Sequence, residues 1–296
     1  MHIQYIDRKT GQTCTEKVYG LLFLSLLYGD GFWRELFAKV FRPFSARALF
    51  LSRFYGYLQK RPASAKKVAP FIREFGVDES EFVETSFHSF NDFFIRKLKP
   101  EARPINEDPQ VVCMPADGRY LVYPQFKDFV VKGQEFSLAT FVNNSALAAR
   151  YREGSMAMVR LCPSDYHRFH FPCDGIASKA QLVNGPLYSV NPMALRKRLA
   201  ILSENKRMIT EIETEKFGTI LYIEIGATNV GSIRQTYQAD GNVYKGQEKG
   251  YFEFGGSCIV LLFEKGRIVF DQDLIDNTRK GFETRANFGQ SLGVGK

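Results

Sequence analysis

Residues 255–263, Gly255-Gly256-Ser257-Cys258-Ile259-Val260-Leu261-Leu262-Phe263, join a double glycine to an unbroken apolar run. An apolar run of this length beside glycine is typical of a strand that is buried on both faces. The glycines give the backbone conformations that are closed to other residues, so a strained peptide bond can be held there. We therefore expect a sharp turn at residues 255–256 and a buried strand from Ser257 onward.

The same sequence pattern extends through residues 101–296, where short apolar stretches alternate with glycine-containing turns. The other stretches are Tyr120–Tyr123, Met156–Leu161, Ile220–Ile225 and Arg267–Phe270. This pattern predicts a mainly antiparallel β core, sandwich-like or barrel-like, with one or two inserted helices, of which Met193–Leu202 is the best candidate.

Residues 1–100 differ, because apolar and basic residues recur there at helical spacing. We expect helices from Tyr19 to Phe75 with a loop at Pro62–Ala65, and a short helix over Glu79–Phe87 capped by Asp78 or Ser80. The fold class is therefore predicted as α+β, with N-terminal amphipathic helices packed on the β core. The boundary between the two domains falls near residue 100.

The chain carries a net charge of +8, and an equal excess of positive charge lies between Gly31 and Phe75. Basic residues interleaved with large apolar ones indicate helices that lie on an anionic membrane surface. A core-facing helix pair with a solvated basic face is the other interpretation of this segment.

Five cysteines without close pairing argue against a disulfide framework and a zinc site, and we expect no metal. The apolar run Leu21–Tyr28 is too short to span a bilayer. The unpaired cysteines and the short apolar run are both compatible with a peripheral location on the membrane.

Ser257 is the residue whose position suggests chemistry. Its hydroxyl can attack the preceding carbonyl, and elimination from the resulting ester would break the chain and leave a dehydroalanine that hydrolyses to a pyruvoyl group. That reaction needs a base and donors for the developing oxyanion. A plain glycine turn beside a strand explains the same residues without any chemistry.

Histidine is the natural base, and two of the four histidines, His167 and His170, lie close together. On a strand they would point to opposite faces, whereas on a bent segment both could line one cavity. Asp117 lies in a turn before a predicted strand, where it either caps the turn or orients a histidine. Spacing alone leaves both alternatives open.

Six blocks, taken together and in order, resemble the phosphatidylserine decarboxylase family, which makes a pyruvoyl group by cutting its own chain. They cover roughly residues 85–265 and are Phe90–Pro100 with Arg103–Ile105, Pro115–Gly118, Asp165–Arg168 with His170 and Pro172, Gly185–Asn191, Gly226–Ile233, and Lys245–Gly250 leading to Gly256-Ser257.

The resemblance implies a role for each matching residue. Asp117, His170 and Ser257 match the self-cleavage triad, in which His170 is the base and Asp117 its orienter. Cleavage between Gly256 and Ser257 would give a large chain, 1–256, and a small pyruvoyl chain, 257–296. His167 matches the histidine of the decarboxylation step. The residues expected to line the substrate cleft are Tyr188, Gly226, Ala227, Gly231 and Ser232.

The resemblance also implies the reaction, in which a Schiff base to the pyruvoyl group allows phosphatidylserine to lose carbon dioxide and become phosphatidylethanolamine. It implies a homodimer of large-plus-small units on the cytoplasmic face of a bacterial membrane, with no nucleic-acid partner. Two departures from the usual cleavage sequence, Gly255 for Leu and Cys258 for Thr, leave Cys258 as a second candidate nucleophile. An unprocessed phospholipid-binding homologue and a decarboxylase of a soluble amino acid are the alternative functions.

Overall fold

The computed structural model describes residues 3–19, 49–125, 130–131, 134–135, 137–198, 200–227, 233–255 and 257–296. Three sets of predicted residues lie outside these ranges: residues 20–48 of the helical region expected from Tyr19 to Phe75, Gly231 and Ser232 of the expected cleft, and Gly256 of the expected cleavage site.

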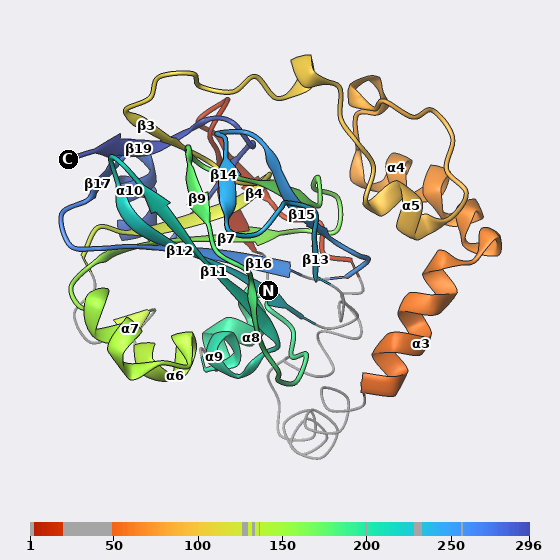
Figure 1. The fold of residues 1–296 in the computed structure, drawn as a ribbon. Coiled ribbons are helices and arrows are strands. Elements are labelled where there is room, and N and C mark those ends of the chain that lie inside the picture. Colours follow the sequence, from red (N-terminus) through yellow and green to blue (C-terminus); the bar gives the residue numbers. More distant parts are fainter. Residues whose placement is uncertain are drawn as a thin grey trace.

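A large, twisted sheet forms the centre of the molecule (Figure 1). Its strands, in spatial order, are β14 (Gly241–Val243), β9 (Gly175–Ala177), β11 (Arg207–Thr214), β12 (Gly218–Gly226), β16 (Ser257–Phe263), β7 (Ser155–Leu161), β4 (Gly118–Tyr123), β18 (Glu283–Ala286), β1 (Gln4–Asp7) and β2 (Thr13–Thr15), with β10 (Gln181–Val183) also paired to β11.

The pairings in this sheet are antiparallel except for the parallel pair of β1 with β18. The sequence therefore predicted the central strands and their mostly antiparallel pairing correctly. The strand path among the described residues does not close on itself, so the sandwich-like prediction is confirmed and the barrel-like one is wrong.

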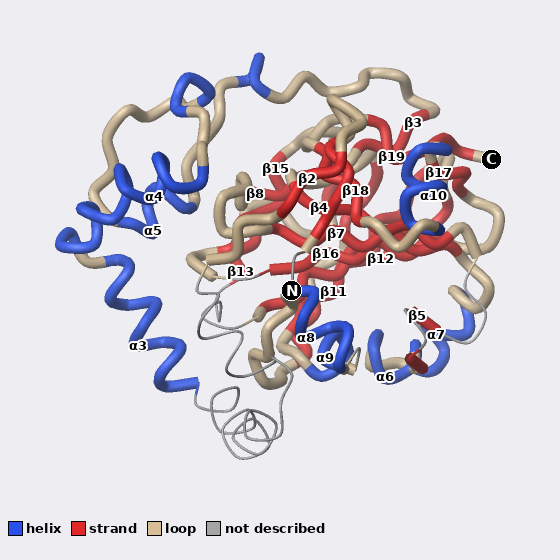
Figure 2. Tube along the Cα trace, turned by 180° about the vertical axis from the view of Figure 1, so that it is seen from behind, coloured by secondary structure: helices blue, strands red, loops and turns tan. Residues whose placement is uncertain are grey.

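Side chains alternate between the two faces of the large sheet. On β16, Cys258, Val260 and Leu262 enter one apolar cluster, whereas Ile259, Leu261 and Phe263 enter another. The first cluster is completed by four short helices, which lie in a row against that face (Figure 2). They are α6 (Leu138–Val142), α7 (Ser145–Arg150), α8 (Pro192–Lys197) and α9 (Ile201–Glu204).

The second cluster is completed by two three-stranded sheets and helix α10 (Gln272–Arg279). One sheet consists of β13 (Ile233–Gln235), β15 (Glu248–Phe252) and β8 (Arg168–His170). The other consists of β17 (Ile268–Phe270), β19 (Ser291–Gly295) and β3 (Val111–Cys113). The large sheet is thus covered on both faces, as its near-continuous apolar strands require. A separate two-stranded pair joins β5 (Val130–Val131) to β6 (Gln134–Glu135).

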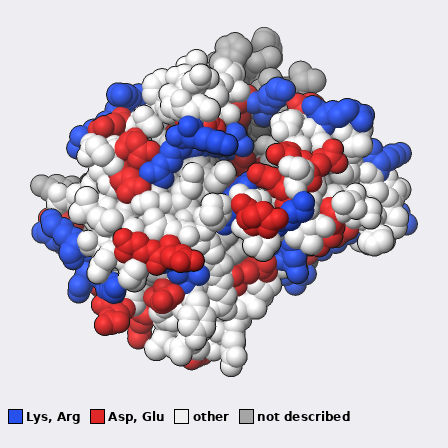
Figure 3. All heavy atoms as spheres, turned by 90° about the horizontal axis from the view of Figure 1, so that it is seen from above, with Lys and Arg blue, Asp and Glu red and all other residues white. Residues whose placement is uncertain are grey.

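The remaining helices form a group to one side of the sheets (Figure 1). They are α3 (Leu49–Lys60), the 3₁₀ turn η1 (Pro62–Lys67), α4 (Val68–Phe75), η2 (Glu79–Glu81) and α5 (Phe90–Phe94), followed by η3 (Pro100–Ala102). A third apolar cluster holds α4 and α5 together, and it includes Phe254 from the segment just before β16. Seen from above, basic and acidic side chains are interspersed among broad uncharged areas (Figure 3).

Three predicted elements differ from the structure. The helix expected over Glu79–Phe87 is only the turn η2, and the true helix, α5, begins at Phe90 because the Ser89 side chain caps it. The helix expected over Met193–Leu202 is divided into α8 and α9, since Arg198 has an extended backbone. The loop expected at Pro62–Ala65 is the 3₁₀ turn η1.

Candidate functional site

Ser257 is the first residue of β16 and is fully buried. It pairs with Gly226 of β12 on one side and Leu161 of β7 on the other. Its Oγ atom has no hydrogen-bond partner in the described part of the chain. A buried hydroxyl without a partner is uncommon, because desolvation costs free energy that nothing here offsets. The position is therefore a candidate for chemistry.

Cys258, the neighbouring residue, lies on the opposite face of the strand. Its side chain belongs to the apolar cluster under helices α6–α9. Burial raises the pKa of the Cys258 thiol above its ordinary value, so the thiolate that a nucleophile needs is disfavoured. These two observations favour Ser257 over Cys258 as the reactive residue.

His167 is fully buried in the bend that leads into β8. Its Nδ1 atom lies 2.9 Å from the backbone carbonyl oxygen of Asp165, which can only accept, so Nδ1 carries the proton of the neutral ring. Its Nε2 atom has no partner among the described residues. Burial lowers the pKa of His167 to about 3, which keeps the ring neutral near pH 7 with a free lone pair on Nε2.

The surroundings of Asp165 explain how His167 is held. The Asp165 carboxylate accepts from Arg119 and from the Cys162 amide, at 2.7 Å for the latter. On its other side, the His167 ring packs against Phe94 of α5, with the ring centroids 3.8 Å apart. The imidazole is therefore fixed both by a hydrogen bond and by packing.

His170 is the last residue of β8 and is also buried. Its ring stacks on Phe288 at a centroid distance of 3.8 Å, and its Nδ1 atom has no partner in the described residues. Burial, and next the nearby positive charge of Arg168, lower the pKa of His170 to about 3. This ring is thus neutral as well and able to accept a proton.

Asp117 lies directly before β4, and Arg103 holds its carboxylate in a fork. The closest contact of the fork joins Arg103 Nη2 to Asp117 Oδ2 at 2.7 Å. The backbone N–H of Phe288 donates to Asp117 Oδ1 at 2.8 Å. Burial raises the pKa of Asp117, and the Arg103 guanidinium opposes that rise.

Phe288 therefore touches both Asp117, through its amide, and His170, through its ring. The hydrogen bonds of the described Asp117 carboxylate go to Arg103 and Phe288, and none goes to His170. Arg103 is a site residue to which the family resemblance assigned no role. Its place in the block with Pro104 and Ile105 was the only signal.

Seven buried side-chain atoms in the described residues have no hydrogen-bond partner, and three of them are His167 Nε2, His170 Nδ1 and Ser257 Oγ. The others belong to Arg96, Arg119, Tyr222 and Glu224. Native proteins leave few such groups, so their concentration on residues chosen from sequence is informative. Atoms that exchange protons with a substrate or with one another during a reaction would be expected to lack fixed hydrogen-bond partners in this way.

Of the residues expected to line a cleft, Tyr188, Gly226 and Ala227 are described. Asn205 joins two of them, because its Nδ2 atom donates to the carbonyl oxygens of Tyr188 at 2.8 Å and Gly226 at 2.9 Å. Gly226 lies opposite Ser257, so this amide fixes the backbone beside the candidate nucleophile. Asn205 is a further residue that sequence patterns did not mark for this role.

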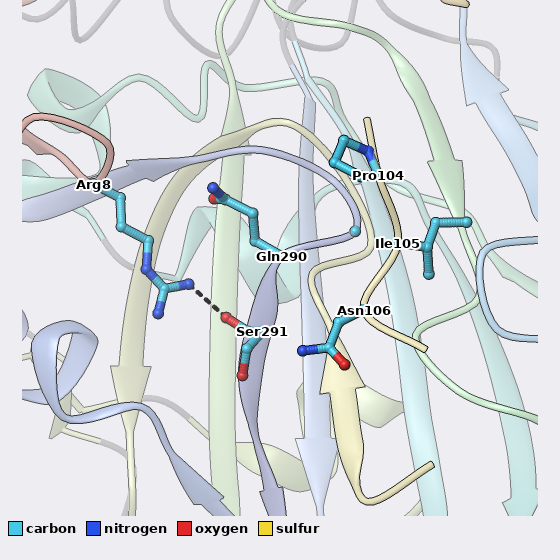
Figure 4. A pocket seen from close by; sticks show the side chains of 7 residues that line it. Arg8, Pro104, Ile105, Asn106, Gln290 and Ser291 are labelled. Carbon is cyan, nitrogen blue, oxygen red and sulfur yellow. Dashed lines mark hydrogen bonds between the residues drawn. The ribbon is translucent and has the colours of Figure 1, made fainter. Parts of the chain in front are cut away.

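A surface hollow of about 450 Å³ lies elsewhere, and none of the four candidate catalytic residues lines it (Figure 4). Its Arg8 guanidinium is already occupied, by the Ser291 carbonyl oxygen and by Asp271 and Asp273. Its lining residues are Arg8, Pro104, Ile105, Asn106, Gly289, Gln290 and Ser291. Within the described ranges, no cluster of three or more His, Cys, Asp or Glu side chains could hold a metal ion.

A family model and individual curated proteins indicate the same family for this chain. The family model described as "Phosphatidylserine decarboxylase" matches residues 90–294. Curated proteins named "Phosphatidylserine decarboxylase proenzyme" are similar to this chain over 98% of its length: those of Chlamydia caviae at 47% identity, Chlamydia pneumoniae at 46% and Fusobacterium nucleatum at 45%. The match covers 97%, 96% and 97% of those proteins, respectively.

Proposed function

This chain belongs to the phosphatidylserine decarboxylase family, and we propose that it cuts itself between Gly256 and Ser257 to make the pyruvoyl group that the reaction uses. The enzyme removes the serine carboxyl group of phosphatidylserine and yields phosphatidylethanolamine. The observation that carries the residue assignment is the set of unpartnered buried atoms on Ser257, His167 and His170.

The proposed cleavage begins with the Ser257 hydroxyl. Its Oγ atom bonds to the carbonyl carbon of Gly256 while the peptide C–N bond breaks, and the hydroxyl proton is taken up by a base. His170 suits that task, because its neutral ring has an unpartnered nitrogen. Asp117 would orient His170 indirectly, because its carboxylate holds the Phe288 amide and the Phe288 ring packs on His170.

Elimination completes the proposed cleavage. The α-proton of residue 257 leaves, its Cβ–Oγ bond breaks, and Gly256 departs with a free carboxylate. Water then replaces the nitrogen of the dehydroalanine, which is released as ammonia. The overall balance is one water consumed and one ammonia formed, and the products would be residues 1–256 and a pyruvoyl-capped chain beginning at 257.

The residues proposed for the site suit such a group. Ser257 and His167 are fully buried, which keeps both side chains from water, and Ser257, His167 and His170 carry unpartnered polar atoms that a carbonyl or a bound substrate could use. When present, a pyruvoyl group supplies the conjugated carbonyl that accepts the electrons released with carbon dioxide.

His167 is proposed to move the proton of the decarboxylation step. With Nδ1–H committed to the Asp165 carbonyl, the Nε2 atom is the proton carrier. Nε2 would take a proton from the substrate ammonium and later return it to the carbon that has lost carbon dioxide. A neutral ring at neutral pH is the starting state that this sequence of steps requires.

We further propose that the helices before residue 100 rest on an anionic membrane, which would keep the lipid substrate within reach. Phe54 and Tyr57 on α3 are 51% and 56% exposed, and exposed basic residues follow directly. Those basic residues are Lys60, Arg61, Lys66, Lys67 and Arg73. Exposed aromatics beside basic side chains suit the lipid interface. The described residues contain no helix long and apolar enough to span a bilayer.

The proposal includes a membrane-docking helical region within residues 1–100, apart from β1 and β2, which belong to the large sheet. It also includes a catalytic region of residues 101–296 and a homodimer on the cytoplasmic face of a bacterial membrane. Bacterial relatives support the source. Light scattering of the purified enzyme tests the dimer.

Carbon dioxide release from phosphatidylserine vesicles tests the function. The wild-type protein should release it, Ser257→Ala should neither cleave nor release it, and His167→Ala should cleave without releasing it. His88→Ala is the matched control, since His88 is an exposed histidine outside the site and should retain activity. Activity on free serine with none on vesicles would overturn the assignment of a lipid substrate.

A further inference from the structure

The segment just before the proposed cleavage site is held by helix α5. Asn91 accepts a hydrogen bond at its Oδ1 atom from the backbone N–H of Phe254, at 2.9 Å. Both groups are buried, and they are 163 residues apart in the chain. Phe254 lies three residues before Ser257, so this bond fixes the backbone close to the bond that is to break.

Packing reinforces the hydrogen bond. The Phe254 ring contacts Phe90 and Phe94, at centroid distances of 5.2 and 5.0 Å, and both belong to the same helix turn as Asn91. Gly255 follows with a φ of 141°, a conformation that residues with a side chain rarely adopt. The chain thus turns sharply immediately after the point at which α5 holds it.

Helix α5 is itself anchored at both ends. The Phe90 N–H donates to Ser64 Oγ at 2.9 Å, and Ser89 caps the helix by accepting from the Asp92 amide at 3.1 Å. Beyond the other end, Arg96 donates to the Ser164 carbonyl at 3.1 Å. A five-residue helix anchored in this way is a rigid support for what it binds.

The same helix touches the proposed proton carrier. Phe94 packs on the His167 ring, while the His167 carbonyl accepts from the Phe252 N–H at 3.0 Å. The segment that carries the cleavage site and the bend that carries His167 are therefore fixed to one support. Intramolecular attack depends strongly on orientation, so such a support contributes directly to the cleavage rate.

We propose that Asn91 is a positioning residue for self-cleavage, which acts by holding the Phe254 N–H and so orienting the Gly256–Ser257 bond toward the Ser257 hydroxyl. This inference rests on the proposed self-cleavage. After the cut, Phe254 belongs to the end of the large chain and is no longer joined to residue 257. Asn91 should therefore control the rate of processing and have little effect on the turnover of processed enzyme.

The test measures processing and turnover separately. Full-length chains are made by cell-free synthesis, cleavage is timed from the loss of the 33.8 kDa species, and decarboxylation of vesicles is normalised to the pyruvoyl content. Asn91→Leu, which removes the acceptor, should slow cleavage by at least about tenfold, the scale of one lost buried hydrogen bond. Asn91→Asp retains an acceptor oxygen and should cleave within about threefold of the wild-type rate.

Asn277→Leu is the matched control, because Asn277 lies on α10 and its Nδ2 atom donates to Thr284 Oγ1 at 3.0 Å, away from residues 252–257. It should cleave at the wild-type rate. If Asn91→Leu does not fold, Asn91→Ser, which is too short to reach Phe254, replaces it. Once fully processed, the Asn91 variant should show wild-type kcat and KM per pyruvoyl.

Three results would overturn the inference alone. They are cleavage of Asn91→Leu at the wild-type rate, an equal loss of cleavage and of kcat per pyruvoyl, and equal slowing by Asn277→Leu, since the effect would then be general. Failure of the wild-type chain to cleave would instead refute the proposed function.

Discussion

Acid should destabilise the unprocessed protein through His167 and His170, which burial holds neutral. The pKa of each is lowered from an ordinary value of 6.5 to about 3. The unfolded chain therefore binds protons at these two residues first, as the pH falls through 6.5, while the folded protein does not. Stability from this source is fully present above pH 6.5 and is lost progressively as the pH falls toward 3.

The magnitude follows from the two pKa values. Near pH 5 the unfolded form of each histidine gains about 2 kcal/mol from proton binding, and the folded form gains almost nothing. The two together should lower the free energy of unfolding by about 4 kcal/mol between about pH 7.5 and about pH 5. That loss is a large part of the roughly 5–15 kcal/mol that is typical of a folded domain.

The assay is urea unfolding followed by circular dichroism, with Ser257→Ala as the background so that one intact chain unfolds. His167→Asn retains a donor for the Asp165 carbonyl, and His170→Gln retains a polar side chain, but neither titrates. Each should reduce the acid loss by about 2 kcal/mol relative to the background. The buried carboxyls Asp117 and Glu224, whose pKa values are raised, are present in all three proteins. Their contribution to the acid loss therefore cancels when the proteins are compared.

An acid loss that is identical in all three proteins would refute the reasoning. It would mean that burial does not hold the two histidines neutral as the pH falls.

Three further expectations concern other parts of the molecule. Lys249→Met should cost about 3–5 kcal/mol in chemical unfolding, because it leaves Glu224 buried without its partner; the double variant with Glu224→Gln should recover much of that loss. Arg103→Lys should slow self-cleavage in a timed mass assay, since a lysine cannot reproduce the guanidinium fork on Asp117, and an unchanged rate would argue against a role for that fork. Replacing both Phe54 and Tyr57 with Ser should weaken sedimentation with anionic vesicles by at least about tenfold, while the same change at the exposed but distant Val269 and Val294 should not.

The sequence predicted the strands of the β core because their signal is local. The runs Met156–Leu161, Ile220–Ile225 and Ser257–Phe263 are apolar with one exception each, Arg160, Glu224 and Ser257. Such near-continuous apolar runs suit strands covered on both faces, and all three are central strands of the large sheet. The family resemblance then selected Asp117, His167, His170 and Ser257. The structure buries all four side chains, and all but Asp117 carry a polar atom without a partner among the described residues.

The helices near residue 90 were harder to predict, since aromatic packing rather than helical periodicity sets their limits. Phe82, Phe87, Phe90 and Phe93 all enter one cluster, although only the last two are helical. A local signal did exist: Ser89 and Asp92 cap one end of α5 reciprocally, with the Ser89 hydroxyl accepting from Asp92 and the Asp92 carboxylate accepting from the His88 amide.

The partners of the site residues lie beyond the reach of local patterns. Arg103 forms an ion pair with Asp117, Phe288 stacks on His170, and Asn91 accepts a hydrogen bond from Phe254. Each pair joins residues that are separated in the sequence. Hydrogen bonds between distant segments depend on the packed fold. A single sequence therefore shows the reactive residues more readily than the residues that orient them.

The intact mass of the purified wild-type protein, denatured without reducing or basic treatment, tests the central claim most directly. Self-cleavage predicts two species, residues 1–256 ending in a free carboxyl and residues 257–296 beginning with a pyruvoyl group, whose masses sum to that of the precursor plus one water minus one ammonia. The Ser257→Ala protein should remain a single chain. A wild-type protein found only as one intact 33.8 kDa chain would contradict the account.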